Sequence, residues 1–203
     1  GFERSWLGKL SENNPRLQVV DLSEGLELLY GTHHHEEGHL HDGEAYPDPH
    51  IWCSPRLARR MVETMYRALT EIDPDGASVY AENYARIDRR FAQLDSVLTD
   101  KLRPFKGKVF AVYHPTLSYW AADYGLRQLA LEPDGKSPSP QYLRAMVDSA
   151  RHVGVEVVFI QQEFDPRQAE TFAREVGCRT EIINPLAYTW SEEIMRIADA
   201  FIR

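Results

Sequence analysis

The sequence lacks the cysteine patterns of small zinc folds and redox motifs. Its 203 residues contain two cysteines, Cys53 and Cys178, which form neither a CxxC pair nor a Cys/His finger. Two separate thiols neither require nor exclude an oxidising compartment. Long apolar runs are also missing. No stretch approaches the roughly 18 to 20 residues that a membrane-spanning helix needs, and the N-terminal GFERSWLGKL has no continuous apolar core of a signal peptide.

An excess of positive charge is absent as well. Asp and Glu (31) outnumber Lys and Arg (23), which gives a formal net charge of -8, and the basic residues are scattered along the chain. This distribution argues against a nucleic-acid partner or an anionic membrane surface, because both require clustered Lys and Arg. An acidic surface suits a cationic ligand, and it equally favours solubility.

Catalytic signatures are missing too. The chain has no HExxH, no GxSxG and no glycine-rich phosphate loop. Glu132 and Glu163 follow predicted strands and could form a carboxylate pair for general acid/base work. Each is explained more simply as a solvated loop acid or as a partner for a nearby Lys or Arg. We therefore predict that the protein is not an enzyme.

The most unusual segment is GTHHHEEGHLHDGEAYPDPHIW at residues 31–52. Five histidines are interleaved with acids there, and a sixth, His50, follows in DPHIW; the five are His33, His34, His35, His39 and His41. Residues 31–46 have neither a two-residue nor a 3.6-residue apolar period, which predicts a loop. Imidazole and carboxylate donors at this density indicate divalent-metal binding. The alternatives are a solvated polar loop, an expression tag and, for His50 alone, a packed structural histidine.

Apolar periodicity predicts a short helix at residues 3–10 and a strand at 17–23. Ser54-Pro55 supplies the cap and first turn of a helix that runs to about residue 72. A helix at about 77–102 follows, nearly 40 Å long at about 1.5 Å per residue, and this length predicts that it joins two lobes. The predicted boundaries are 1–76 for the rest of an N-terminal lobe, 77–102 for the linker helix and 103–203 for a C-terminal α/β lobe.

Strands and helices alternate after residue 103. The predicted strands are 108–114, 126–132, 155–162 and 180–185, and the predicted helices are 116–124, 140–153, 166–176 and 188–202. Four strand–helix units predict a parallel, doubly wound α/β sheet with its ligand-binding edge at the carboxyl ends of the strands. The polar residues at such ends are His114, Glu132, Gln161, Glu163 and Asn184.

His114 stands in VYHPTLSYW, where an apolar strand meets the next helix. This position favours a ligand-binding role, and the alternative is a histidine that caps the helix. His152 ends a predicted helix in ARHVG, where a polar or cationic side chain meets the last carbonyl groups favourably. We interpret His152 as structural.

Several motifs, taken in order, resemble the metal-binding solute receptors of bacterial zinc and manganese ABC importers, the ZnuA/TroA-like family. They are DPHIW with SPRLA, EIDPDGASVYAENYARIDRRF, VYHPTLSYWAADYGL, KSPSPQYL, VVFIQQEFDPRQAETFAREVG and INPLA. The resemblance implies two α/β lobes joined by a rigid helix, with one metal ion in the cleft and His50 and His114 among its ligands. Manganese-type members carry Glu at the second position, so His114 and the histidine-rich loop favour the zinc branch.

The sequence departs from the family pattern at two points. The family takes another histidine from a DPH-type loop upstream of everything seen here, so the resemblance implies an N-terminal truncation with an incomplete first lobe. Many relatives also place an acid where INPLA has Asn184, and a neutral amide is a weaker donor for a divalent cation. Asn184 and Glu132 are therefore possible further ligands.

The function that these patterns predict is capture of Zn²⁺, with Mn²⁺ second, and its delivery to a membrane permease. The protein would be a monomer in the periplasm or otherwise outside the cytoplasm, free or lipid-anchored. The alternatives are a zinc-dependent hydrolase that uses the same histidines with an open coordination position, and a metal-buffering surface adhesin.

Overall fold

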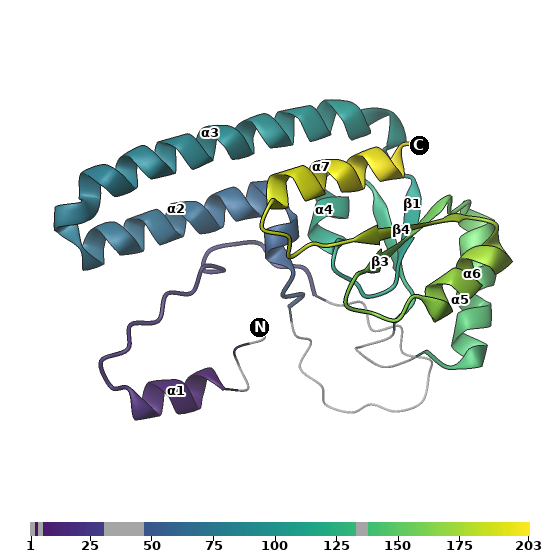
Figure 1. The fold of residues 1–203 in the computed structure, drawn as a ribbon, viewed down its shortest axis with the longest axis horizontal. Coiled ribbons are helices and arrows are strands. Elements are labelled where there is room, and N and C mark those ends of the chain that lie inside the picture. The colour runs from purple at the N-terminus through teal and green to yellow at the C-terminus, as the bar shows by residue number, and fades with distance from the viewer. Residues whose placement is uncertain (1–2, 4–5, 31–46, 133–137) are drawn as a thin grey trace.

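A four-stranded parallel sheet forms the core of a lobe at one end of the protein (Figure 1). The computed structural model describes residues 3, 6–30, 47–132 and 138–203. The strands are β1 (Val109–Val112), β2 (Arg127–Ala130), β3 (Val157–Gln161) and β4 (Arg179–Ile183), in the order β2-β1-β3-β4. β1 and β3 are buried throughout, as their unbroken apolar sequences predict for central strands covered on both faces.

Helices cover both faces of the sheet, which confirms the predicted doubly wound α/β fold. Successive strand residues point to opposite faces, so Phe110 packs in one layer and Ala111 in the other. The helices are α4 (Ser118–Asp123) and α7 (Trp190–Phe201) on the Phe110 side, and α5 (Pro140–Val153) and α6 (Arg167–Val176) on the Ala111 side. β2 lies on one side of β1 and β3 on the other, so the order of strand addition reverses at the carboxyl ends of β1 and β3, which is a topological switch point.

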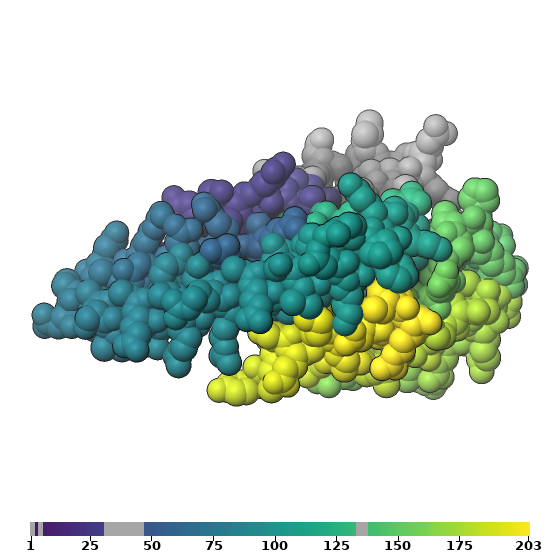
Figure 2. All heavy atoms as spheres, turned by 90° about the horizontal axis from the view of Figure 1, so that it is seen from above, coloured from purple at the N-terminus to yellow at the C-terminus, as the bar shows by residue number. Residues whose placement is uncertain are grey.

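Two long helices extend from this lobe as an adjacent pair, α2 (Pro55–Ile72) and α3 (Ala77–Leu102) (Figures 1 and 2). Both helices start and end where the sequence predicts. At the start of α2, the Ser54 hydroxyl accepts the Leu57 N–H at 3.0 Å and caps the helix. A stacked pair of rings, Tyr66 and Tyr84, lies between the helices with centroids 4.7 Å apart. None of the helices in the described ranges combines the length and apolarity that crossing a membrane requires.

The start of α2 is fastened to the sheet lobe by Asp123, which ends α4. The Ser54 hydroxyl donates to the Asp123 carboxylate, and Arg56 donates to the Asp123 carbonyl oxygen at 3.0 Å and to Asp95 on α3 at 2.9 Å. Burial raises the pKa of Asp123, and the opposing effects of Ser54 and Arg56 do not cancel it. This cluster sets the direction in which the chain leaves His50 and enters α2.

The prediction of a strand at 17–23 is wrong. Residues 17–21 form neither helix nor strand and 22–25 form a turn, with Leu17, Val19 and Val20 between 41% and 52% exposed. A β-branched run becomes a strand only beside a partner, and in the described part of residues 1–76 the only pairing is the Tyr30–Pro47 bridge. The predicted helix at 3–10 also lies later, as α1 (Leu7–Asn13).

Candidate metal centre

His50 directly precedes a short 3-10 helix (Ile51–Cys53) that leads into α2, and it is 6% exposed. Its ring Nδ1 is 2.7 Å from Asp48 Oδ1, and its backbone N–H donates to the same oxygen at 2.9 Å. Burial raises the pKa of Asp48, but the hydrogen bonds from His50 outweigh burial and leave that pKa below its usual value. An ionised Asp48 therefore accepts a hydrogen bond from the Nδ1–H group of the neutral imidazole, whose lone pair then lies on Nε2.

His114 follows β1 at the topological switch point of the sheet. Its Nδ1 contacts the carboxylate of Glu132, which is 8% exposed and follows β2. The Gln161 side chain at the end of β3 holds the main chain on both sides: it accepts the His114 N–H at 3.3 Å and donates to the His114 carbonyl oxygen at 2.6 Å. The imidazole stacks on Phe164 with centroids 5.2 Å apart. These contacts fix both the position and the tautomer of His114.

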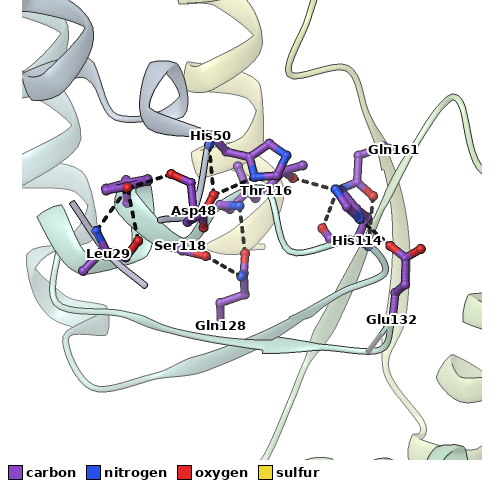
Figure 3. A network of polar contacts seen from close by, with 11 residues as sticks. Leu29, Asp48, His50, His114, Thr116, Ser118, Gln128, Glu132 and Gln161 are labelled. Atoms are coloured by element: carbon purple, nitrogen blue, oxygen red, sulfur yellow. Dashed lines mark hydrogen bonds and ion pairs between the residues drawn. The ribbon is translucent and has the colours of Figure 1, made fainter. Parts of the chain in front are cut away.

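The fold brings the two histidines together (Figure 3). Their ring centroids are 5.2 Å apart, and the rings meet edge to face at 80°. Each ring has a carboxylate against Nδ1, from Asp48 and Glu132 respectively. A carboxylate in this position orients an imidazole and raises the basicity of Nε2. Such a carboxylate is the usual outer partner of a metal-ligating histidine. The arrangement suits binding of a cation that prefers nitrogen donors.

The other predicted site residues have different surroundings. The Asn184 side-chain oxygen accepts the Leu186 N–H at 3.1 Å, so it closes a turn of its own chain. That turn lies beside the His50 segment, because the Trp52 indole donates to the Pro185 carbonyl oxygen at 3.3 Å. The cluster His33, His34, His35, His39 and His41 lies outside the described residues.

Two imidazoles are not a complete coordination sphere. Across residues 3, 6–30, 47–132 and 138–203, no group of three or more His, Cys, Asp and Glu side chains is arranged to hold a metal ion. Sequence reasoning missed Asp48, although a signal was present. Asp before Pro commonly accepts the N–H two residues on, and Asp48 does so with His50.

Comparison with known proteins identifies the family. A family model described as periplasmic zinc-uptake complex component A (ZnuA) matches residues 1–200. The zinc-binding lipoprotein AdcA of Streptococcus pneumoniae (strain ATCC BAA-255 / R6) is 28% identical over 201 residues, which cover 93% of this chain and 39% of the relative. The high-affinity zinc uptake system protein ZnuA of Bacillus subtilis (strain 168) is 29% identical over 180 residues, or 86% of this chain and 56% of the relative.

A crystal structure of ZnuA has a TM-score of 0.86 and 32% sequence identity to this chain, and the match covers 98% of this chain and 74% of that chain. The resemblance to the zinc branch, noted from the motifs, is thereby confirmed. The chain spans 39% and 56% of the lengths of the two curated relatives. Because the family model matches all but three of its residues, the chain belongs to the zinc-uptake complex component A family.

Proposed function

We propose that this protein is the solute-binding component of a bacterial zinc importer, and that His50 and His114 are two of the ligands that capture Zn²⁺ as its cargo. The observation that carries the proposal is the carboxylate against Nδ1 of each ring. It directs both lone pairs to the Nε2 atoms of two imidazoles whose centroids are 5.2 Å apart. The family description and the names of both relatives support zinc as the ion.

Zinc rather than manganese follows from the donor type. Imidazole nitrogen suits zinc, whereas manganese prefers carboxylate, carbonyl and water oxygen. Glu132 is the nearest carboxylate to His114, but its oxygen already contacts the imidazole Nδ1. We therefore assign Glu132 to orienting His114 and not to the ion. Asn184 could bind the ion through its side-chain oxygen only by giving up the hydrogen bond that this oxygen accepts from Leu186.

The remaining ligands then come from water or from outside the described residues. The resemblance implies one upstream histidine. The loop histidines in 31–46 would act as accessory collectors that deliver ions to His50, and this role stays a prediction.

The lobe boundaries also stay a proposal. Residues 1–76 would belong to the first lobe, 77–102 to the linking helix and 103–203 to the second lobe. The bounds of α3, Ala77–Leu102, support the range 77–102 for the linking helix. The zinc-loaded protein would act outside the cytoplasm, as the periplasmic and lipoprotein names of its relatives suggest, and would release the ion to a membrane permease.

Growth under zinc limitation tests the transport role. A strain that lacks the gene should grow poorly in zinc-depleted medium, and the complete protein should restore growth. A double variant, His50→Ala with His114→Ala, expressed at the same level, should not. Full recovery with the double variant would contradict the site, and a deletion strain without a zinc-dependent defect would indicate buffering instead of transport.

A hydrolytic function is the weaker alternative. It needs a general base beside the metal-bound water, and Glu132, the candidate for that base, already accepts a hydrogen bond from His114. The family is one of uptake components and not of enzymes.

Replacing Glu132 with glutamine should weaken zinc binding about tenfold, at the lower end of the range for outer partners of ligating histidines. The amide keeps the size of the side chain but loses the negative charge that makes Nε2 a stronger donor. Competition with a chelator of known zinc affinity measures the change.

Glu156→Gln is the matched control for this experiment. Glu156 is exposed, directly precedes β3 and pairs with Lys108 at 3.3 Å. It lies at the amino end of the strand, opposite the histidines, so zinc affinity should stay within about twofold of wild type. Equal losses in both variants would mean that overall charge, and not the contact with His114, sets the affinity.

A further inference from the structure

Tyr119 on α4 holds the segment that carries His50. Its side chain is 2% exposed. Its hydroxyl donates to the Asp48 carbonyl oxygen at 2.8 Å and accepts the Leu29 N–H at 3.1 Å. The Asp48 N–H in turn donates to the Leu29 carbonyl oxygen at 2.7 Å. One phenol therefore fixes both sides of the short backbone pairing from which the chain continues to His50.

Gln128 holds the start of the helix that carries Tyr119 (Figure 3). The Leu117 N–H donates to Gln128 Oε1 at 2.8 Å, and Gln128 Nε2 donates to the Ser118 hydroxyl oxygen at 2.9 Å. Gln128 on β2 therefore holds both the main chain just before α4 and the first side chain of that helix. The first turn of α4 is thus fixed against β2, and it contacts the Asp48 carbonyl oxygen through the Tyr119 hydroxyl.

The same turn is tied closely to His114. Only three residues separate His114 from the start of α4, and Gln161 Nε2 donates both to the His114 carbonyl oxygen and to Thr116 Oγ1, each at 2.6 Å. The helix that follows one histidine therefore holds the aspartate that orients the other. We propose that Tyr119 is a positioning residue for His50, acting through Asp48, and that it thereby sets the spacing of the two imidazoles; the zinc consequence rests on the proposed function above.

The phenol matters because its two partners are backbone groups in a part-buried place. Without the hydroxyl, the Asp48 carbonyl and the Leu29 N–H lose their common partner, and a buried polar group without a partner is costly. The Asp48 segment then moves to find other partners, and its carboxylate no longer holds His50 Nδ1 in one geometry. The imidazole becomes a mixture of tautomers, in which only the form with the lone pair on Nε2 binds the ion.

Tyr119→Phe tests this on the complete protein with two measurements. Chelator competition should give an affinity for Zn²⁺ about tenfold weaker than wild type, as for other outer partners of ligating histidines. In the zinc-free protein at about pH 8, above the ordinary range of imidazole titration, ¹⁵N spectra should place the His50 proton on Nδ1 in wild type. In Tyr119→Phe the same spectra should show a mixture.

Tyr80→Phe is the control, since it removes a tyrosine hydroxyl from the start of α3, where α2 ends and away from the two histidines. The Tyr80 hydroxyl donates to Asp73 at 2.7 Å, so both readouts should match wild type. Gln128→Ala, which removes the contacts that hold the first turn of α4 against β2, should repeat the tautomer change and serves as the test if Tyr119→Phe does not fold.

A wild-type tautomer in Tyr119→Phe, or an equal tautomer change in Tyr80→Phe, would overturn the proposal. The spectra of the zinc-free protein test the positioning role of Tyr119 independently of the proposed zinc-binding function. A tautomer change in Tyr119→Phe together with unchanged zinc affinity in His50→Ala would uphold the positioning role and refute His50 as a ligand.

Discussion

Replacing His114 with alanine should weaken zinc binding by about 10² to 10³-fold. Four-ligand zinc sites in proteins bind with apparent free energies of about 10–16 kcal/mol, so one ligand accounts for about 2.5–4 kcal/mol, and every 1.4 kcal/mol or so is tenfold in Kd. The truncation also leaves Glu132, which is 8% exposed, without its imidazole partner. Competition with a chelator of known affinity, on the complete protein, measures the change.

His152→Ala provides the control, because it deletes the same ring from an exposed position in the last turn of α5. Its zinc affinity should stay within about twofold of wild type. His50→Ala should lose about as much as His114→Ala, and the double variant less than the sum, since two ligands of one ion are not independent. Wild-type affinity in His114→Ala would refute the site.

The fold was largely predictable because its determinants are local. Ser54-Pro55 fixes the start of α2 through a cap and a proline. The apolar residues of α3 repeat with the helical period along its whole length, which shows how far that helix extends. The apolar run at β3 indicates a strand buried on both faces wherever it pairs. Residues 17–23 have a similar composition but stay unpaired, since a strand also depends on its neighbours.

The candidate site was predictable in part. His114 could be found because the carboxyl end of a parallel strand at a switch point is a binding position whatever the sequence around it. The outer partners could not be found in this way. Glu132 meets His114 only through the pairing of β1 with β2, and Tyr119 reaches the Asp48 carbonyl across 71 residues of sequence. Contacts of this kind follow from tertiary packing and have no local signature.

The long helix α3 has two roles along its length. Toward its start, Asp88 pairs with Arg59 of α2 at 2.8 Å, while Leu94, Leu98 and Leu102 near its end are buried in the same cluster as Phe110. Asp95 between these leucines also binds Arg56, which directs the start of α2 just after His50. The proposed linker is thus part of the sheet lobe over its last turns, and stability of that lobe bears on the position of His50.

Leu98→Ala should therefore lower the free energy of unfolding by about 2–5 kcal/mol, because Leu98 is 0% exposed and its loss leaves a cavity in a packed cluster. For a chain of this size the change is about 4 to 20 °C in Tm, measured by thermal unfolding of the zinc-free protein. Val97→Ala, at the adjacent position that is 43% exposed, should change stability by no more than about 0.5 kcal/mol.

Saturating zinc should raise the Tm of Leu98→Ala, since an ion that binds only the folded state stabilises it. Equal losses in Leu98→Ala and Val97→Ala would contradict the role of burial, because alanine favours the helix at both positions and only the packing of Leu98 distinguishes them. A wild-type Tm in Leu98→Ala would mean that α3 is a linker detached from the sheet core, so the position of His50 would depend on α2 alone.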